Sequence, residues 1–269
     1  MSIFMNMFIR EMKAYKKSLI IWCIGVLLMV AGGMGKYSAL SGTGQSMNDI
    51  MAQMPKSIQT IMGTGSFDLS KAGGFYGVLF LYLVVMAAVH AAMLGANIIA
   101  KEERDKTAEF LLVKPVSRNE IISVKLGAGF TNILIFNAVT LLSSLVIVGH
   151  YSGSEPVTGG IVKLMTGMFI LQLMFMLIGT GIAAVSRKPK TAAAAAAGIL
   201  LLAFVLDKAV DLNKNLEILK YLTPFKYFEA KNLMSGRGFE PVFVILSLVI
   251  MAVLLSITYV FYQKKDLNM

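Results

Sequence analysis

The sequence FYGVLFLYLVVMAAVHAAMLGANIIA, residues 75–100, contains no Lys, Arg, Asp or Glu. A run of about 20 apolar residues spans a bilayer as a helix, because a helix satisfies its own backbone polar groups. This stretch therefore predicts a transmembrane helix. The charged stretch KEERDKTAEFLLVKPVSRNEIISVK, residues 101–125, follows it directly and is predicted to lie in water at the end of that helix.

Five more apolar runs occur along the 269 residues, which are 57% hydrophobic and 15% charged with a mean hydropathy of +0.72. The predicted fold class is all-α, a single polytopic membrane domain over residues 1–269 with six transmembrane helices. The fifth run has room for about 24 Å of helix, so it must be buried in protein, thin the bilayer or extend past Asp207. The predicted spans are 19–35, 75–100, 128–149, 161–185, 191–206 and 242–262.

The distribution of Lys and Arg predicts the orientation of these spans. An even number of spans places both termini on one side, and that side, with residues 1–18, 101–127, 186–190 and 263–269, carries fifteen of the 25 basic residues. Cytoplasmic loops are enriched in Lys and Arg, so both termini are predicted to be cytoplasmic. The net charge of +10 then reflects topology and anionic lipid, and we expect no nucleic-acid partner.

Residues 1–18 have helical periodicity, with apolar residues on one side and basic residues on the other. We predict an elbow helix lying in the membrane interface with its apolar side in the lipid; a simple charged tail is the alternative. Glu11 interrupts the apolar side. The apolar side consists of Phe4, Met7, Phe8, Met12 and Tyr15.

Two longer segments, 36–74 and 207–241, are predicted on the outer side. The first has apolar residues at helical spacing from Ile50 to Met62, which predict one amphipathic helix that ends at Gly63. Its Met-rich face is expected to pack on the bundle, and contact with a hydrophobic substrate is the alternative. The second segment is aromatic and is expected to pack on the outer ends of the spans or to dip partway into the membrane. Residues 192–197, six alanines, predict close helix packing or a subunit interface.

The segment at residues 101–127 has a well-defined local pattern. A short apolar stretch from Thr107 to Val113 precedes Pro115, which disfavours helix in the residue before it. Ser117 and Glu120 are spaced as a capping box, which predicts a new helix that begins at Ser117 and continues into the third span. The short apolar helix is therefore expected to sit between two stiff supports and to need a partner surface.

The pattern E-x-x-x-T-x-E-x-L-L-x-x-P-x-S-R, followed after six further residues by Lys125, resembles the signature of ABC-2 type transporter permease subunits. The outer stretch LKYLTPFKYF, residues 219–228, is similar to that family's last extracellular loop. Lys106 departs from the pattern, since the family often has glycine before the threonine. The resemblance covers essentially the whole chain. The residues of the signature are Glu103, Thr107, Glu109, Leu111, Leu112, Pro115, Ser117 and Arg118.

The resemblance implies the transmembrane subunit of an ATP-binding cassette transporter in a prokaryotic plasma membrane, and favours export. It implies a dimer with a second permease copy or paralogue, and separate cytoplasmic ATPase subunits that hold ATP and Mg. The short helix would be the coupling helix that docks on the ATPase. The implied contact and shaping residues are Glu103, Thr107, Glu109, Phe110, Leu111, Leu112, Pro115, Ser117 and Arg118.

The chain has no G-x-x-x-x-G-K-[ST] phosphate loop, so no cofactor, metal or catalytic residue is expected in it. Its single cysteine, Cys23, excludes an intrachain disulfide and a cysteine-based metal site. An ion-coupled secondary transporter, an intramembrane enzyme and a structural or sensory protein remain alternatives. The sequence does not identify the substrate, although the apolar and aromatic outer segments favour an amphipathic or hydrophobic one. Polar residues within the spans are costly there and are candidates for function. An intramembrane enzyme would need such groups, and Asn132 is one of them. The candidates for the translocation path are His90, Asn97, Asn137 and Gln172.

Overall fold

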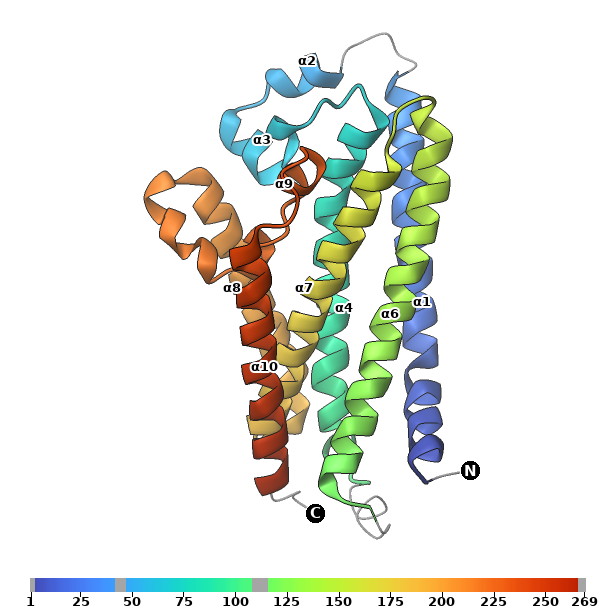
Figure 1. Cartoon of the computed structure of the whole chain (residues 1–269), viewed down its shortest axis with the longest axis vertical. Coiled ribbons are helices and arrows are strands. Elements are labelled where there is room, and N and C mark those ends of the chain that lie inside the picture. The colour runs from blue at the N-terminus through green and yellow to red at the C-terminus, as the bar shows by residue number, and fades with distance from the viewer. Residues whose placement is uncertain (1–2, 42–46, 108–115, 266–269) are drawn as a thin grey trace.

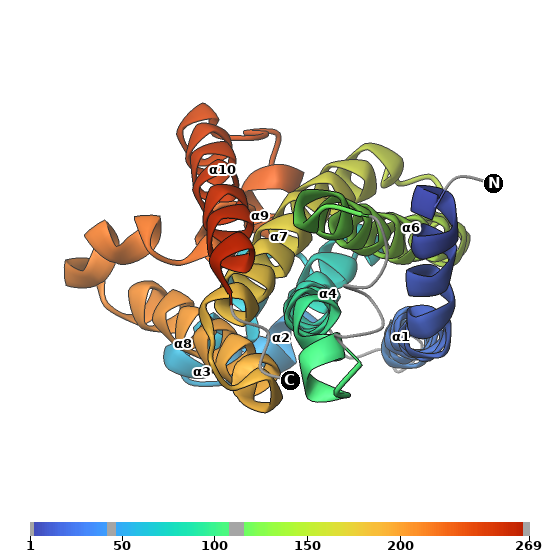
Figure 2. The same ribbon diagram turned by 90° about the horizontal axis from the view of Figure 1, so that it is seen from below.

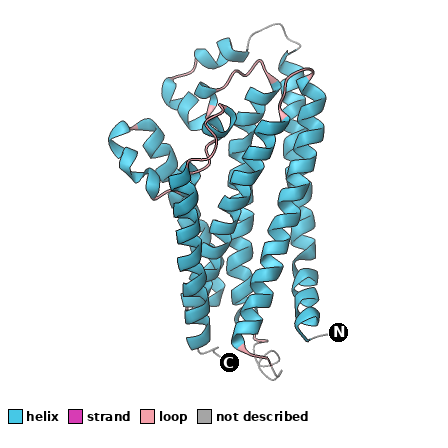
Figure 3. Cartoon of the chain, in the orientation of Figure 1, coloured by secondary structure: helices cyan, strands magenta, loops and turns pink. Residues whose placement is uncertain are grey.

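The computed structural model describes residues 3–41, 47–107 and 116–265. Within these ranges the chain is helical and contains no β-strand (Figure 3). In these described ranges six helices are long and apolar enough to cross a membrane, which confirms the predicted fold class. They are α1 (Ile3–Ser41), α4 (Ala72–Arg104), α6 (Arg118–Ser152), α7 (Thr158–Val185), α8 (Ala192–Leu212) and α10 (Pro241–Lys264) (Figure 1).

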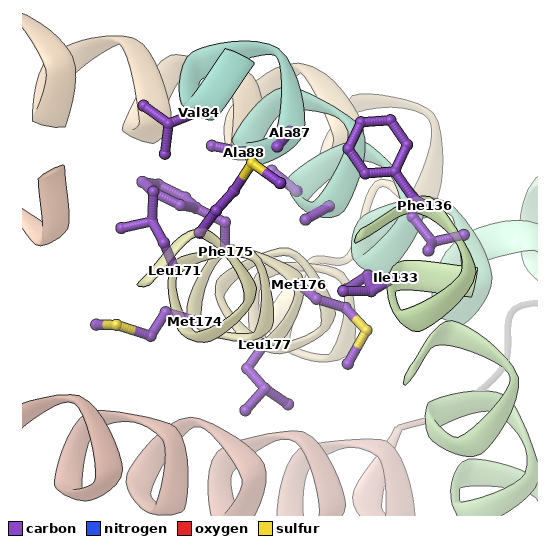
Figure 4. Close-up of a cluster of buried hydrophobic side chains, with 14 of the residues drawn as sticks. Val84, Ala87, Ala88, Ile133, Phe136, Leu171, Met174, Phe175, Met176 and Leu177 are labelled. Carbon is purple, nitrogen blue, oxygen red and sulfur yellow. The ribbon is translucent and has the colours of Figure 1, made fainter. Parts of the chain in front are cut away.

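The helices α4 and α7 form the centre of the bundle and pack against each other more extensively than any other pair. Figure 2 shows α1 and α6 on one side of this pair, and α8 and α10 on the other. Figure 4 shows α7 end-on, with Phe175 directed toward α4 and Met176 toward Ile133 of α6. The side chains of Phe175 and Ile133 are fully buried.

Glycines bring the backbones of α4 and α7 into direct contact. A Cβ atom on Gly95 of α4 would lie 2.0 Å from the backbone oxygen of Met176, and one on Gly179 of α7 would lie 2.3 Å from that of Ala92. Real Cβ atoms do not approach a backbone this closely, so both positions require glycine. Small residues at helix interfaces allow such close packing in membranes.

The bundle has two ends. We call the end at which α1 begins and α10 finishes the terminal end, and the opposite end the distal end (Figure 1). The distal end carries three short helices, α2 (Met47–Ala52), α3 (Lys56–Met62) and α9 (Ala230–Met234). The prediction of one amphipathic helix from Ile50 to Met62 was wrong, because Pro55 separates α2 from α3. Gly63 ends α3 in the left-handed conformation, as predicted.

The N-terminal residues 3–18 form the first turns of α1, and no separate elbow helix is seen in this described range. Figure 2 shows these turns at an angle to the rest of α1, which is seen end-on. Met7 is buried, and Phe8, Met12 and Tyr15 pack on the hydrophobic core. The expectation that this apolar face lies in lipid was therefore wrong: it faces the bundle, and Phe4 alone among its five residues is strongly exposed.

The fifth span is longer than its apolar run. α8 continues past Asp207 to Leu212, which gives 21 residues and about 32 Å of helix. It packs on α4 and α7 through few residues, and most of its surface faces outward. Of its six consecutive alanines, Ala192 and Ala196 are buried.

Candidate functional site

The predicted coupling helix lies largely outside the described residues. Glu109, Phe110, Leu111, Leu112 and Pro115 fall in the range 108–115, whose structure is not described. Thr107 on one side and Val116 on the other are described. The helices that support this segment, α4 before it and α6 after it, are therefore both visible.

The first support is the end of α4, which is closed by a Schellman motif. The backbone N–H of Thr107 donates to Glu102 O at 2.8 Å, and that of Lys106 donates to Glu103 O at 3.3 Å. Lys106 has φ +56°, the left-handed conformation that glycine adopts most easily at this position. The sequence departure at Lys106 therefore falls at the one residue of the motif where glycine fits best.

The second support is the start of α6, where the predicted capping box is present. The Ser117 backbone N–H donates to Glu120 Oε2 at 2.7 Å, and the Glu120 N–H donates to Ser117 Oγ at 3.2 Å. The helix then continues without a break to Ser152. These reciprocal bonds satisfy two backbone donors at the helix start.

A buried ion cluster joins the two supports to α1, and we call it the terminal ion cluster: Glu11, Glu102 and Lys125, with Arg10 and Lys101 at its edge. Lys125 Nζ donates to Glu102 Oε2 at 2.7 Å and to Ile98 O at 2.6 Å. Only 1% of Lys125 and 1% of Glu11 is exposed. The cluster therefore fixes α1, α4 and α6 to one another at the terminal end.

Arg10 and Lys101 complete the balance of charge in this cluster. Arg10 Nη2 lies 3.1 Å from Glu11 and 3.5 Å from Glu102, while Lys101 Nζ lies 4.0 Å from Glu11. Lys125 Nζ is also 4.0 Å from Glu11. Two carboxylates thus meet three cations, and a buried carboxylate such as Glu11 is tolerated because cations surround it.

A second set of contacts ties the end of α10 to the same region. Arg118 Nη1 donates to the backbone oxygens of Gln263 and Lys265 at 2.8 and 2.7 Å. Lys265 Nζ lies 2.8 Å from Glu103 Oε2 and donates to Ala183 O at the end of α7. A cation at the C-terminal end of a helix is favourable because its carbonyl groups carry partial negative charge. Glu103 and Arg118, two predicted ATPase-contact residues, therefore hold α10 in place.

The candidate translocation-path residues do not converge on one site. Asn137 Nδ2 donates to Gln172 Oε1 at 3.1 Å, and this pair is buried between α6 and α7. His90 instead stacks on Phe136 with ring centroids 4.9 Å apart, and its Nδ1 has no hydrogen-bond partner in the described residues.

The other two polar candidates lie elsewhere. Asn97 accepts a hydrogen bond from Arg104 at 2.7 Å near the end of α4. Asn132 donates to Ala128 O within its own helix and contacts Met12 of α1. Neither of the two cavities described below is lined by any of the five candidates.

Sequence reasoning missed several residues of the terminal end. Glu102, Glu11 and Lys265 were not assigned a role, although one of them was noticed: Glu11 is a charge on an otherwise apolar helical face. Such a charge needs a buried partner, because an unpaired ion is costly in an apolar environment. That argument predicts a cation opposite Glu11 but does not identify Lys125.

A second ion cluster occupies the distal end. Asp207, Asp211 and Glu229 offer carboxylate oxygens within 4.8 Å of one another, a spacing that suits a metal ion. Lys226 Nζ lies among them, 2.5 Å from Asp211, 3.6 Å from Asp207 and in contact with Glu229. Burial lowers the pKa of Lys226, but the carboxylates of Asp207 and Glu229 outweigh it and raise this pKa above its ordinary value. The ammonium group thus takes the position that a cation would fill.

This distal cluster forms the rim of a cavity of about 320 Å³ between α3, α4 and α8. Its inner wall is apolar and includes Phe80, Phe225 and Phe228. The cluster fixes the segment between α8 and α10 to the bundle, since Asp207 and Asp211 lie on α8 and Lys226 and Glu229 follow it.

Two comparisons with known proteins gave different results. A search of curated proteins gave no match. The family model of the ABC-2 family transporter protein matches residues 5–267, which covers all six long helices, the terminal ion cluster and the distal cluster. The chain therefore belongs to the ABC-2 transporter family, as a multi-pass membrane permease.

Proposed function

We propose that this chain is the membrane subunit of an ATP-driven exporter, and that a separate ATPase binds the segment between α4 and α6. Family membership supports a permease without its own ATP site. The proposed contact residues are Thr107, Glu109, Phe110, Leu111 and Leu112. Pro115 and Ser117 would shape the segment, while Glu103 and Arg118 would connect it to α10.

The observation that carries this proposal is the way in which the segment is anchored. Its first support ends in a Schellman motif and its second begins with a capping box. Lys125 joins the two supports through Glu102, and it reaches α1 through Glu11. Lys265 and Arg118 extend the connection to α10. A displacement of this segment by a bound protein would therefore reach four of the six spans. A partner that binds two conformations unequally shifts their populations by that difference in affinity.

The same proposal fixes the orientation and the assembly. The terminal end, which holds most of the Lys and Arg of the short connections, would face the cytoplasm of a prokaryotic cell. Two such chains would sit on two ATPase subunits that bind ATP and Mg. α8 and α10 support a second copy, because they expose Leu202 (70%) and Ile245 (61%) and thus offer apolar surface to another membrane helix or to lipid.

The test is purification from the native membrane in mild detergent, with mass spectrometry of the proteins that remain bound. We expect an approximately equimolar protein that contains a phosphate loop. Phe110→Asp should leave membrane insertion intact and abolish this association. Ile218→Asp is the matched control, because Ile218 is 76% exposed at the distal end. Recovery of the chain alone, in a detergent that preserves other complexes, would contradict the proposal and favour an ion-coupled transporter.

A further inference from the structure

An apolar groove of about 510 Å³ lies between α1 and α4, below the short helix α2 at the distal end. Leu28, Gly32 and Lys36 line it from α1. These three residues are spaced by four and therefore share one face of the helix. The opposite wall comes from α4 and includes Leu79 and Tyr82.

The length and chemistry of the groove fit a hydrocarbon chain. From Leu28 to Lys36 it follows eight residues of helix, about 12 Å, close to the roughly 15 Å that one leaflet contributes to the hydrocarbon core. Met47, Met51 and Met62 also line it, and methionine adapts its shape to irregular apolar ligands.

Gly32 keeps this groove open. A Cβ atom on Gly32 would meet no other atom within 4 Å, so a larger side chain here would project into free space. The adjacent Gly33 is different, because its Cβ would lie 2.6 Å from Leu79 and thus marks the point at which α1 and α4 touch.

A positive charge stands at one end of the groove. Lys36 is exposed, and its ammonium group has no ion pair or hydrogen bond in the described part of the chain. It lies near the distal end of α1, at the level where lipid headgroups begin if residues 19–35 span the bilayer. An unpaired cation above an apolar groove is complementary to an anionic amphiphile.

We propose that this groove binds one acyl chain of an anionic membrane phospholipid, with its phosphate group against Lys36. The proposal is independent of the transport function, since it depends only on the groove and its charge. One lysine near an anionic lipid contributes about 1 kcal/mol, which corresponds to an approximately fivefold preference over a zwitterionic lipid.

The test uses the full chain in nanodiscs of phosphatidylcholine that contain a trace of photoactivatable lipid. The lipid carries a diazirine in its acyl chain and a headgroup of either phosphatidylglycerol or phosphatidylcholine. After irradiation, mass spectrometry maps the labelled residues, and we expect label on Met51 and Tyr82. Phosphatidylglycerol should label them about fivefold more than phosphatidylcholine.

Three variants separate the parts of the proposal. Lys36→Gln should reduce the headgroup preference to about one while the chain still enters. Gly32→Leu should fill the groove and reduce labelling by both lipids several-fold. Gly35→Leu is the matched control, because Gly35 also has free space within 4 Å but does not line the groove.

Two results would overturn the proposal. Equal labelling of the groove by both lipids in the wild-type chain would show that Lys36 does not select an anionic headgroup. Equal labelling of Gly32→Leu and Gly35→Leu would show that the lipid lies outside the groove. Because Lys36→Gln changes an exposed side chain, it remains informative even if Gly32→Leu fails to fold.

Discussion

Replacing Lys125 by methionine should destabilise the bundle strongly at the terminal end. The ammonium group makes three contacts of 2.6 to 2.9 Å, two of them to the Glu102 carboxylate, in a site where the lysine is 1% exposed. Removing one partner of a buried ion pair costs about 3–5 kcal/mol. Arg10 remains 3.5 Å from Glu102 and offsets part of the loss. We therefore expect a loss near the lower limit, about 3 kcal/mol.

The free energy of unfolding can be measured by SDS titration in mixed micelles, followed by far-UV circular dichroism and by tryptophan fluorescence. Trp22 is the only tryptophan in the chain and lies 5.5 Å from the His90 ring, so its emission reports the separation of α1 from α4. Lys163→Met is the control, because this lysine is exposed on α7 and should change stability by less than about 0.5 kcal/mol.

A second variant tests the cause of the loss. Lys125→Met combined with Glu102→Leu removes both charges of the Lys125–Glu102 pair and leaves Glu11 with Arg10 and Lys101. The double variant should be less destabilised than Lys125→Met alone, because apolar replacement of a buried pair is often nearly neutral. The idea that the terminal ion cluster holds these helices together would be refuted by either of two results. Lys125→Met could have the same free energy of unfolding as Lys163→Met, or the double variant could have a lower one than Lys125→Met alone.

Further substitutions test other contacts. Gly95→Ala should cost about 3 kcal/mol or more in the same titration, since its Cβ would lie 2.0 Å from the α7 backbone. Gly127→Ala, with no atom within 4 Å, should instead be neutral or slightly stabilising, and similar losses in both variants would contradict the close α4–α7 contact. Ser117→Ala should lose about 1 kcal/mol with the capping box, and an unchanged free energy of unfolding would refute that role. Lys226→Met should remove the cation that contacts all three carboxylates and leave them with Lys208 and Lys231, which limited proteolysis would detect as faster cleavage between α8 and α10; unchanged cleavage would show that Lys226 does not fix the segment.

The six spans and the supports of the segment between α4 and α6 could be predicted because their signals are local. An apolar run of sufficient length specifies a membrane helix, and the spacing of Ser117 and Glu120 specifies a helix start. The break at Pro55 is a local signal too, because proline lacks the backbone N–H that a continuous helix would need, and it overrides the apolar spacing on either side. These features depend on residues within a few positions of one another.

The pairing of residues across the bundle could not be predicted in the same way. Glu11 meets Lys125 only because α1 and α6 pack with a particular rotation about their axes. The same dependence separates His90 from the Asn137–Gln172 pair. A rotation of one residue, about 100°, would bring different polar groups together. Sequence periodicity identifies an apolar face but not the residue opposite it.

The direct backbone contact of α4 with α7 limits how this protein can change shape. At Gly95 and Gly179 the two backbones touch with no side chain between them, so at these two points no change of rotamer could accommodate sliding. The α4–α7 pair should therefore move as one rigid body. In a transport cycle α8 and α10 would then move relative to this pair, whereas a movement of α1 and α6 would require the terminal ion cluster to rearrange.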